Sequence, residues 1–164
     1  MTRIEVPVQL RWSDMDAYAH VNNVEMLRLL EEARIEVFWR HPDGPDGAPP
    51  EGGRPTAVID AGPGALTSTL VARQEIQYVR PVPYRRAPVV IELWIGHLGG
   101  ASLDVCYEVR DVPSRADGST LYAKAITTIV LVDSATGSPR RLTDDERAVW
   151  QPYVEEPVVM RRRA

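Results

Sequence analysis

The sequence has 164 residues, of which 44% are hydrophobic and 26% charged, and its net charge is −4. This length and composition suit one compact domain spanning residues 1–164. The negative charge excludes general nucleic-acid binding, and no stretch approaches the ~18 apolar residues of a membrane span, so we expect neither nucleic acid nor a membrane as partner. Cys106 is the only cysteine, and the N-terminus lacks the long apolar run of a signal peptide. Both features favour a cytoplasmic location.

The first quarter of the chain predicts a strand followed by a long helix. Residues 4–12 alternate weakly and end in a β-prone run, which indicates a strand. Residues 22–40 show amphipathic helical periodicity over about five turns. The apolar stripe of this helix consists of Met26, Leu30, Ala33 and Val37, widened by Leu27, Leu29 and Phe38. A stripe this broad indicates a helix that packs closely against a sheet.

Residues 41–66 are rich in proline and glycine, which excludes a long helix or a central strand there. We expect an irregular, partly mobile surface loop with one short ordered piece near Thr56–Asp60. Such a loop can act as a lid over a site, or it can be an insertion without a function of its own. The sequence leaves both interpretations open.

The second half of the chain predicts strands. Residues 70–78 alternate, and residues 88–98 and 102–111 flank a Gly99-Gly100 turn, which indicates a hairpin. A last strand covers residues 120–132. Thr143 and Glu146 have the spacing of a capping box, so a short helix is expected to begin near Thr143. The basic end at residues 161–163 is predicted to be a flexible tail.

Only one expected helix is long enough to fill the concave face of a sheet. The sequence therefore predicts an α+β fold in which a curved antiparallel sheet wraps around one long helix. The competing arrangement is a flat sheet with the helix packed on one side.

The start of the long helix offers a site for a polarised carbonyl oxygen. Asn22 is a suitable N-cap, with Glu25 as its capping-box partner, and its side chain would bind the amide of Val24 or Glu25. The amide of Asn23 would then remain free at the positive end of the helix dipole. Free amides in this position stabilise a carbonyl oxygen that is acquiring negative charge.

Two carboxylates, Asp14 and Asp16, precede this helix, and His20 follows them. A carboxylate beside an oxyanion site can attack a carbonyl or activate a water molecule. Asp is also favoured in turns for purely structural reasons, so both residues have a second interpretation as turn formers.

Several motifs resemble the 4-hydroxybenzoyl-CoA thioesterase-like branch of the hotdog superfamily. The run Trp12–Asp16 followed by His20–Asn23 is similar to that family's aromatic-x-D-x-D-x-x-x-H-V-N-N pattern. Glu31–Arg34 matches the E-x-A-R end of the family's helix, and Gln74–Val82 is similar to its I-x-Y-x-R-P strand end. The resemblance covers about residues 5–135 and implies a hotdog fold with acyl-CoA thioesterase activity.

The resemblance assigns roles to three residues. It implies that Asp16 is the catalytic carboxylate, acting as a nucleophile through a mixed anhydride or as a general base for water, and that the Asn23 amide polarises the thioester carbonyl. His20 and the Asn23 side chain are expected to orient water or substrate, and His20 has a second interpretation as a structural hydrogen-bonding residue. Asp14 is expected to support the turn. The resemblance also implies a homodimer or homotetramer with active sites at the interface.

The binding site for the carrier is less well defined by the sequence. Some members of the family bind CoA phosphates at the turn between the third and fourth strands, where this chain has Gly99, Gly100 and Ser102 but no Arg or Lys. The Gly amides can contact phosphate, and Arg80, Arg85, Arg86 and the basic tail at residues 161–163 are further candidates. An acyl carrier protein therefore remains an alternative to CoA. CoA would be part of the substrate, and we expect no separate cofactor.

Other functions have weaker support. Hotdog hydratases resemble a D-x-N-P-x-H motif, whereas His20 lies four residues after Asp16 with no proline between them. The three histidines show no metal-ligand spacing, and Cys106 lies in the middle of an expected strand without a base partner. A non-catalytic module that binds an acyl group or a partner in the same groove remains an alternative.

Overall fold

The computed structural model describes residues 2–40, 53–60 and 62–162. These residues form five strands, two α-helices and two short 3-10 helices. In chain order the elements are β1 (Ile4–Val8), η1 (Trp12–Asp14), α1 (Asn23–Phe38), β2 (Thr67–Tyr78), β3 (Val89–Leu98), β4 (Ser102–Arg110), β5 (Leu121–Asp133), α2 (Asp144–Trp150) and η2 (Gln151–Tyr153). The predicted first strand is shorter than expected, because the chain turns into η1 after Val8.

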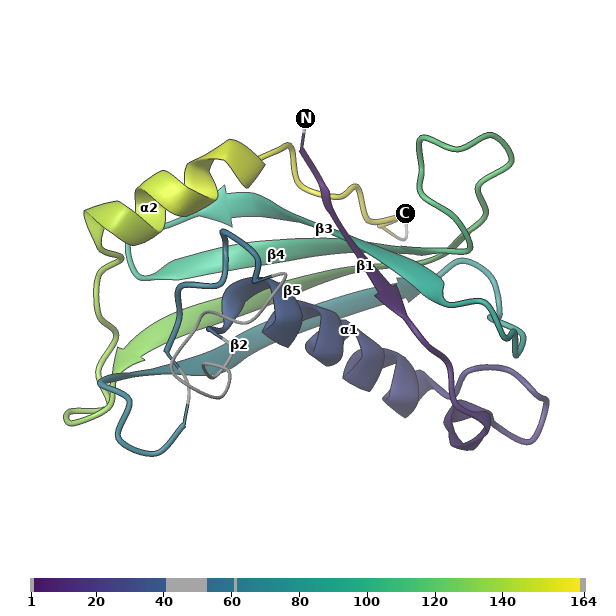
Figure 1. Cartoon of the computed structure of the whole chain (residues 1–164), viewed down its shortest axis with the longest axis horizontal. Coiled ribbons are helices and arrows are strands. Elements are labelled where there is room, and N and C mark those ends of the chain that lie inside the picture. Colours follow the sequence, from purple (N-terminus) through teal and green to yellow (C-terminus); the bar gives the residue numbers. More distant parts are fainter. Residues whose placement is uncertain (1, 41–52, 61, 163–164) are drawn as a thin grey trace.

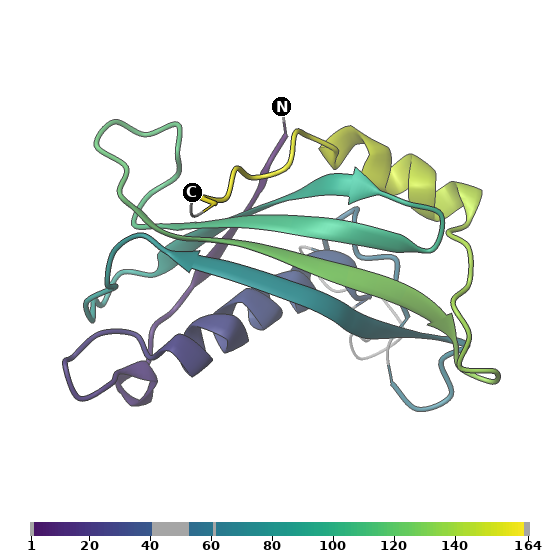
Figure 2. The ribbon, with the colours of Figure 1, turned by 180° about the vertical axis from the view of Figure 1, so that it is seen from behind.

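The strands form one antiparallel sheet with the order β1-β3-β4-β5-β2. The sheet is twisted, and α1 lies along one of its faces (Figures 1 and 2). This arrangement confirms the predicted α+β fold with an antiparallel sheet around one long helix. No helix within the described ranges has both the length and the apolar character needed to cross a membrane.

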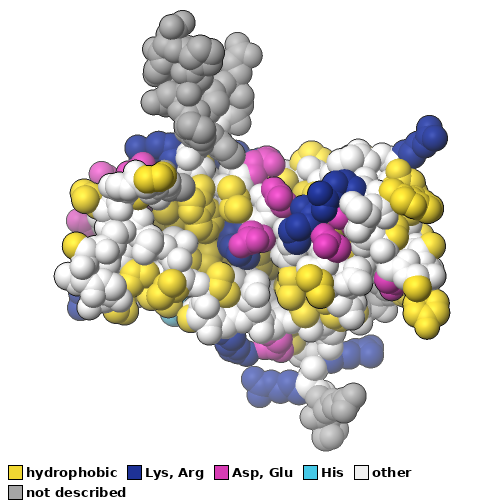
Figure 3. Space-filling view, turned by 90° about the horizontal axis from the view of Figure 1, so that it is seen from below, with side chains coloured by type: hydrophobic (Ala, Val, Ile, Leu, Met, Phe, Trp, Pro, Cys, Tyr) yellow, Lys and Arg dark blue, Asp and Glu magenta, His cyan; other side chains and the backbone are white. Residues whose placement is uncertain are grey.

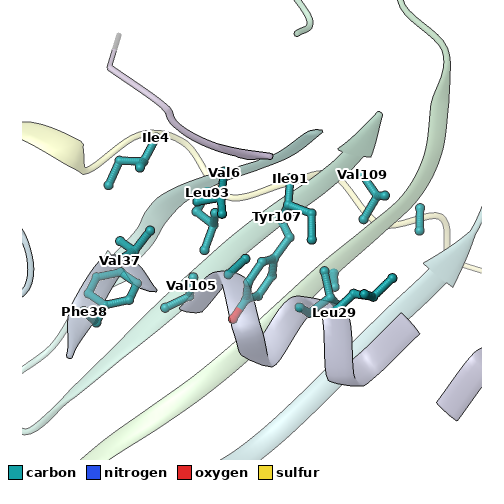
Figure 4. Packing of buried hydrophobic residues seen from close by; sticks show 14 of the residues in the cluster. Ile4, Val6, Leu29, Val37, Phe38, Ile91, Leu93, Val105, Tyr107 and Val109 are labelled. Atoms are coloured by element: carbon teal, nitrogen blue, oxygen red, sulfur yellow. The ribbon is translucent and has the colours of Figure 1, made fainter. Parts of the chain in front are cut away.

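The predicted apolar stripe of α1 forms the helical side of the core. Met26, Leu30, Ala33 and Val37 are all at most 2% exposed. They pack against inward-facing side chains of the sheet, several of which Figure 4 shows between the strands and α1. Burial of this stripe fixes the rotation of α1 about its axis, and therefore the direction in which its N-terminus points.

The short ordered piece predicted near Thr56–Asp60 is present and closes the C-terminal end of α1. Thr56 Oγ1 donates to the Val37 carbonyl over 2.7 Å, which satisfies one of the last carbonyls of the helix. Ile59 forms a parallel bridge with Trp39 and is buried. Residues 41–52 and residue 61, which together make up half of the predicted loop at 41–66, lie outside the described part of the chain. The lid interpretation therefore stays a prediction.

The outer face of the sheet is covered by a C-terminal segment that the sequence does not predict. Glu155 N–H donates to the Ile95 carbonyl over 2.9 Å, and Trp94 Nε1 donates to the Glu156 carbonyl over 2.9 Å. Val158 is buried in a small cluster with Trp94 and Cys106. Residues 161 and 162 are exposed, Arg161 N–H donates to Gln77 Oε1 over 3.2 Å, and residues 163 and 164 lie outside the described ranges, so the flexible tail stays a prediction.

Gly96 leaves room for this segment, which gives a test of its packing. A Cβ atom at Gly96 would lie 2.6 Å from Cys106 Sγ and 3.2 Å from Pro157 Cα. We expect Gly96→Ala to lower the free energy of unfolding by about 1–3 kcal/mol, as overpacking does, and Gly96→Ala/Cys106→Ala to recover part of the loss. Urea unfolding measures both. Gly100→Ala is the matched control, because nothing lies within 4 Å of its added Cβ; an equal loss in both single variants would contradict the account.

Candidate active site

The turn between β1 and α1 is held by the carboxylate of Asp14, which is completely buried. Its Oδ2 accepts from Arg11 N–H over 2.7 Å, and its Oδ1 accepts from the Arg11 and Arg28 guanidinium groups, each at 2.9 Å. Its backbone carbonyl accepts from Asn22 N–H over 2.8 Å. Burial opposes ionisation of Asp14, but the hydrogen bonds from Arg11 and Arg28 prevail and lower its pKa. Asp14 therefore supports the turn, as predicted.

Replacing Asp14 by Asn removes these charge-assisted bonds, and we expect the free energy of unfolding at neutral pH to fall by about 1.5–3 kcal/mol. Because the folded-state pKa of Asp14 lies below its ordinary value of 3.8, this stabilisation is complete above that value and is lost as the pH falls through the lowered pKa. The difference between wild type and variant should therefore shrink on acidification. Urea unfolding of both proteins at neutral and at acidic pH tests this. A difference in unfolding free energy that does not change with pH would contradict it.

The Asp16 carboxylate uses one oxygen in the turn and leaves the other free. Oδ1 accepts from Tyr18 N–H over 2.8 Å and from His20 N–H over 3.1 Å. Asp16 N–H in turn donates to the His20 carbonyl over 2.7 Å, and Ala19 takes a left-handed conformation with φ 60° to close the loop. No hydrogen bond to Oδ2 comes from the described residues. Asp16 is thus both a turn former and the carrier of a fixed, available carboxylate oxygen.

The N-terminus of α1 has the predicted free amide. Asn22 is the N-cap, and its Oδ1 accepts from Val24 N–H over 2.9 Å. Within the described ranges, Asn23 N–H has no hydrogen-bond acceptor. The predicted capping-box role of Glu25 is wrong, because its carboxylate instead accepts from Arg28 Nε over 2.7 Å. The free Asn23 amide lies at the positive end of the helix dipole and can receive a polarised carbonyl oxygen.

A pocket of about 250 Å³ brings these groups together. Its lining includes three predicted site residues, Asp16, His20 and Asn23, and one predicted carrier contact, Arg80. The remaining lining residues are Val21, Met26, Tyr78, Val79, Pro81 and Val82. The sequence does not predict that the segment after β2 forms a wall of this pocket, although the Arg80-Pro81 match to the family pattern is a signal for it.

Two backbone interactions and one side chain hold that wall in place. Val21 N–H donates to the Val82 carbonyl over 2.9 Å, and His20 forms an antiparallel bridge with Pro83. Tyr78, at the end of β2, donates its hydroxyl to the Asn23 carbonyl over 3.3 Å, and burial raises the pKa of this phenol. The end of β2 is therefore tied to the first turn of α1, directly beside the free amide.

Comparison with known proteins identifies the family. The model of the thioesterase-like superfamily matches residues 10–158. The chain belongs to the thioesterase-like superfamily. The match spans the turn, the pocket and the whole sheet apart from β1, and it confirms the expected enzyme class, a thioester hydrolase. No curated protein matches the sequence.

Solved structures confirm the hotdog thioesterase fold. A predicted thioesterase from Bacillus stearothermophilus is 22% identical, with a TM-score of 0.71 over 96% of this chain and 100% of that one. A member of the superfamily from a Jannaschia species is 21% identical, with a TM-score of 0.67 over 94% of each chain. A thioesterase from Thermus thermophilus, complexed with coenzyme A and Zn, is 28% identical, with a TM-score of 0.63 over 91% of this chain and 92% of that one.

The other predicted carrier contacts of this thioesterase lie away from the pocket. Gly99, Gly100 and Ser102 form the β3–β4 turn, at the end of the sheet where Ser102 pairs with Val130 and Val130 with Leu70. Tyr78 is eight residues further along β2, which is roughly 26 Å. Arg85 and Arg86 follow the pocket wall but are not part of the pocket lining.

The β3–β4 turn has basic neighbours that the sequence does not reveal. Arg147, from α2, donates to the Gly99 carbonyl over 2.8 Å, and Leu142 N–H donates to the Gly100 carbonyl over 2.8 Å. These contacts place two segments with basic residues beside a turn that has none of its own. One is α2 with Arg147, and the other is Leu142, which directly follows Arg141. No local pattern predicts this, because the two segments lie far apart in the sequence. Among the residues described, no group of three or more His, Cys, Asp or Glu side chains has a metal-binding arrangement.

Proposed function

We propose that this chain is an acyl-CoA thioesterase, with Asp16 as its catalytic carboxylate and the Asn23 amide as the group that polarises the thioester carbonyl. The observation that carries the proposal is that a carboxylate oxygen and a helix N-terminal N–H, both without partners among the described residues, line the same pocket. Such a pair can supply a nucleophile or base together with stabilisation of an oxyanion.

The reaction follows from these two groups. The thioester carbonyl oxygen accepts a hydrogen bond from Asn23 N–H, which makes the carbonyl carbon more electrophilic. Asp16 Oδ2 then attacks this carbon and expels the CoA thiolate, leaving a mixed anhydride that water cleaves to the free acid and the regenerated carboxylate. In the alternative route, Asp16 takes a proton from water, which attacks the carbon directly. The available Oδ2 serves either route, and His20, which lines the same pocket, would orient the water.

Oligomerisation is a second part of the proposal, and the two edges of the sheet support it. At the β1 edge, the Glu5 carbonyl accepts from Arg54 Nη2 over 3.1 Å, and Pro7 has no N–H to offer on the same edge. The β2 edge is twelve residues long, contains no proline, and carries Leu70 and Val71 at 58% and 48% exposure. We propose that two copies pair along β2 about a two-fold axis.

Pairing along β2 would also complete the binding site for the carrier. Because a two-fold axis makes the paired β2 strands antiparallel, the end of the partner's β2 that lies near its β3–β4 turn comes beside Tyr78 of this chain. The turn at Gly99–Ser102 and the neighbouring Arg147 of one subunit would then face the pocket of the other. We propose that they contact CoA phosphates there, with Arg80 closer to the thioester.

Cys106 is free and buried, which agrees with a proposed cytoplasmic location.

Thiol release from a panel of short, long and aromatic acyl-CoAs tests the activity. We expect wild type to hydrolyse at least one, and Asp16→Asn to lose about a hundredfold or more in kcat, as removal of a general base or nucleophile does. Asn keeps the oxygen that accepts from Tyr18 and His20 N–H, so the turn is preserved. Asp117→Asn, in the exposed β4–β5 loop, is the control.

Each other result has a distinct meaning. If wild type hydrolyses an acyl-acyl carrier protein but none of the CoA esters, the carrier is a protein. If wild type binds an acyl-CoA without hydrolysing it, and Asp16→Ala still binds, the chain is a non-catalytic acyl-binding module.

Light scattering tests the pairing. We expect the wild-type mass in solution to be at least twice the 18.3 kDa of one chain, and Leu70→Glu/Val71→Glu to shift it to that of a monomer, because charge at the edge opposes strand pairing. Val154→Glu introduces charge at a half-exposed valine away from β2 and should leave the mass unchanged. A wild-type monomer at micromolar concentration would refute the pairing.

A further inference from the structure

A chain of polar side chains crosses the inner face of the sheet under α1, away from the catalytic pocket. Arg34 Nη1 donates to the Tyr107 hydroxyl over 3.1 Å, and Thr127 also hydrogen bonds to this hydroxyl. Gln74, on β2, reaches Thr127 Oγ1 from the surface over 3.5 Å. Arg34, Tyr107 and Thr127 are at most 3% exposed. Figure 4 shows the Tyr107 side chain directed from β4 toward α1.

The charge of Arg34 is not fully compensated by its surroundings. Its Nε is buried and has no hydrogen-bond partner among the described residues. Tyr107 offers only a neutral hydroxyl, and Glu31 Oε1 lies 3.6 Å from Nη2 on a side chain that is 57% exposed. A buried cation is costly unless it is paired and hydrogen-bonded. Arg34 therefore retains a donor and a charge that can bind an anion.

The position of Arg34 relates it to the catalytic pocket. It lies about three helical turns after Asn23, on the same side of α1 and roughly 16 Å further along the axis. Leu27 and Leu30 lie between them on that side of the helix. On β2, Tyr78 borders the pocket, and Gln74 contacts the polar chain about 13 Å away. The route from the reacting carbonyl to Arg34 thus runs between the side of α1 that carries these leucines and strand β2.

The β2 side of this route is open to the surface, because Gln74 and Tyr78 are exposed. Seen from below, hydrophobic side chains line a hollow in the face of the molecule, and basic and acidic side chains meet at its border (Figure 3). A medium-length acyl chain that enters from the Asn23 end would place its apolar part against the leucines. The Arg34 side chain leans toward the N-terminus of α1, where its Nη2 approaches Glu31, so the guanidinium lies closer to Asn23 than the Arg34 backbone does. The far end of the acyl chain would come next to this guanidinium.

We propose that Arg34 binds the distal end of the acyl group, and that the enzyme prefers medium-chain acyl groups that carry a terminal carboxylate. This inference rests on the proposed thioesterase function. In the free protein Glu31 provides a weak substitute for the substrate anion. The bound carboxylate replaces Glu31 at Nη2 and accepts from the unpartnered Nε, forming a pair of parallel hydrogen bonds. An acyl chain that ends in a methyl group would instead bring hydrocarbon against a buried cation.

The test compares suberoyl-CoA with octanoyl-CoA, which differ in the terminal group. We expect wild type to favour suberoyl-CoA by about tenfold or more in kcat/KM, the value of hydrogen bonds to a charged group. Arg34→Met should abolish this preference through a higher KM for suberoyl-CoA, with octanoyl-CoA hydrolysed at least as well as by wild type. Glu31→Gln should lower KM for suberoyl-CoA only, because the competing anion is gone. Glu32→Gln, whose carboxylate pairs with Arg28 instead, is the matched control.

A binding measurement separates this inference from the proposed function. Calorimetric titration of Asp16→Asn and of Asp16→Asn/Arg34→Met with both esters needs no turnover, and thermal melting establishes that the variants are folded. Tighter binding of suberoyl-CoA that depends on Arg34 supports the inference. Equal binding of both esters overturns the inference and leaves the proposed function intact. Binding of neither ester also overturns the inference, and thiol release from the wider acyl-CoA panel then decides the proposed function separately. If Arg34→Met does not fold, an unchanged suberoyl-CoA KM in Glu31→Gln overturns the inference.

Discussion

The buried carboxylate of Asp14 is the constraint on which the site depends. This carboxylate accepts hydrogen bonds from both Arg11 and Arg28. The backbone carbonyl of Asp14 accepts from Asn22 N–H and so holds Asn22 at the N-cap position of α1. Without these contacts, the chain between β1 and α1 would be held only by the hydrogen bonds within the Asp16 turn and by the backbone contacts of His20 and Val21 with the segment after β2. These contacts join the end of β1 and the start of α1 into one unit.

This unit sets the geometry of the groups that we propose to be catalytic. Asp16 Oδ1 closes the turn, so Oδ2 has a defined direction and no competing partner among the described residues. Capping by Asn22 satisfies Val24 and leaves the Asn23 amide for a substrate. The burial of the apolar stripe of α1 against the sheet then holds the amide next to the end of β2. The proposed catalytic groups are thus held in place before substrate arrives, which is the condition for effective electrostatic stabilisation.

Features encoded by neighbouring residues were predictable from the sequence. The Asn22 cap, the supporting role of Asp14, the rotation of α1, the β3–β4 hairpin and the Thr143 capping box all depend on short spacings, and the structure contains each of them. Features that depend on distant residues were not predictable. Arg147 reaches Gly99 from α2, and Val158 returns to cover the outer face of the sheet. The Glu25 prediction failed because Arg28, one turn later, offers a stronger charge-assisted bond than a backbone amide.

The most direct test of the central claim is a crystal structure of the Asp16→Asn protein with an acyl-CoA bound. The account predicts the thioester carbonyl oxygen within hydrogen-bond distance of Asn23 N, about 2.7–3.2 Å, and the side chain at position 16 facing the carbonyl carbon. A thioester bound elsewhere, with solvent at the Asn23 amide, would contradict the assignment of both groups.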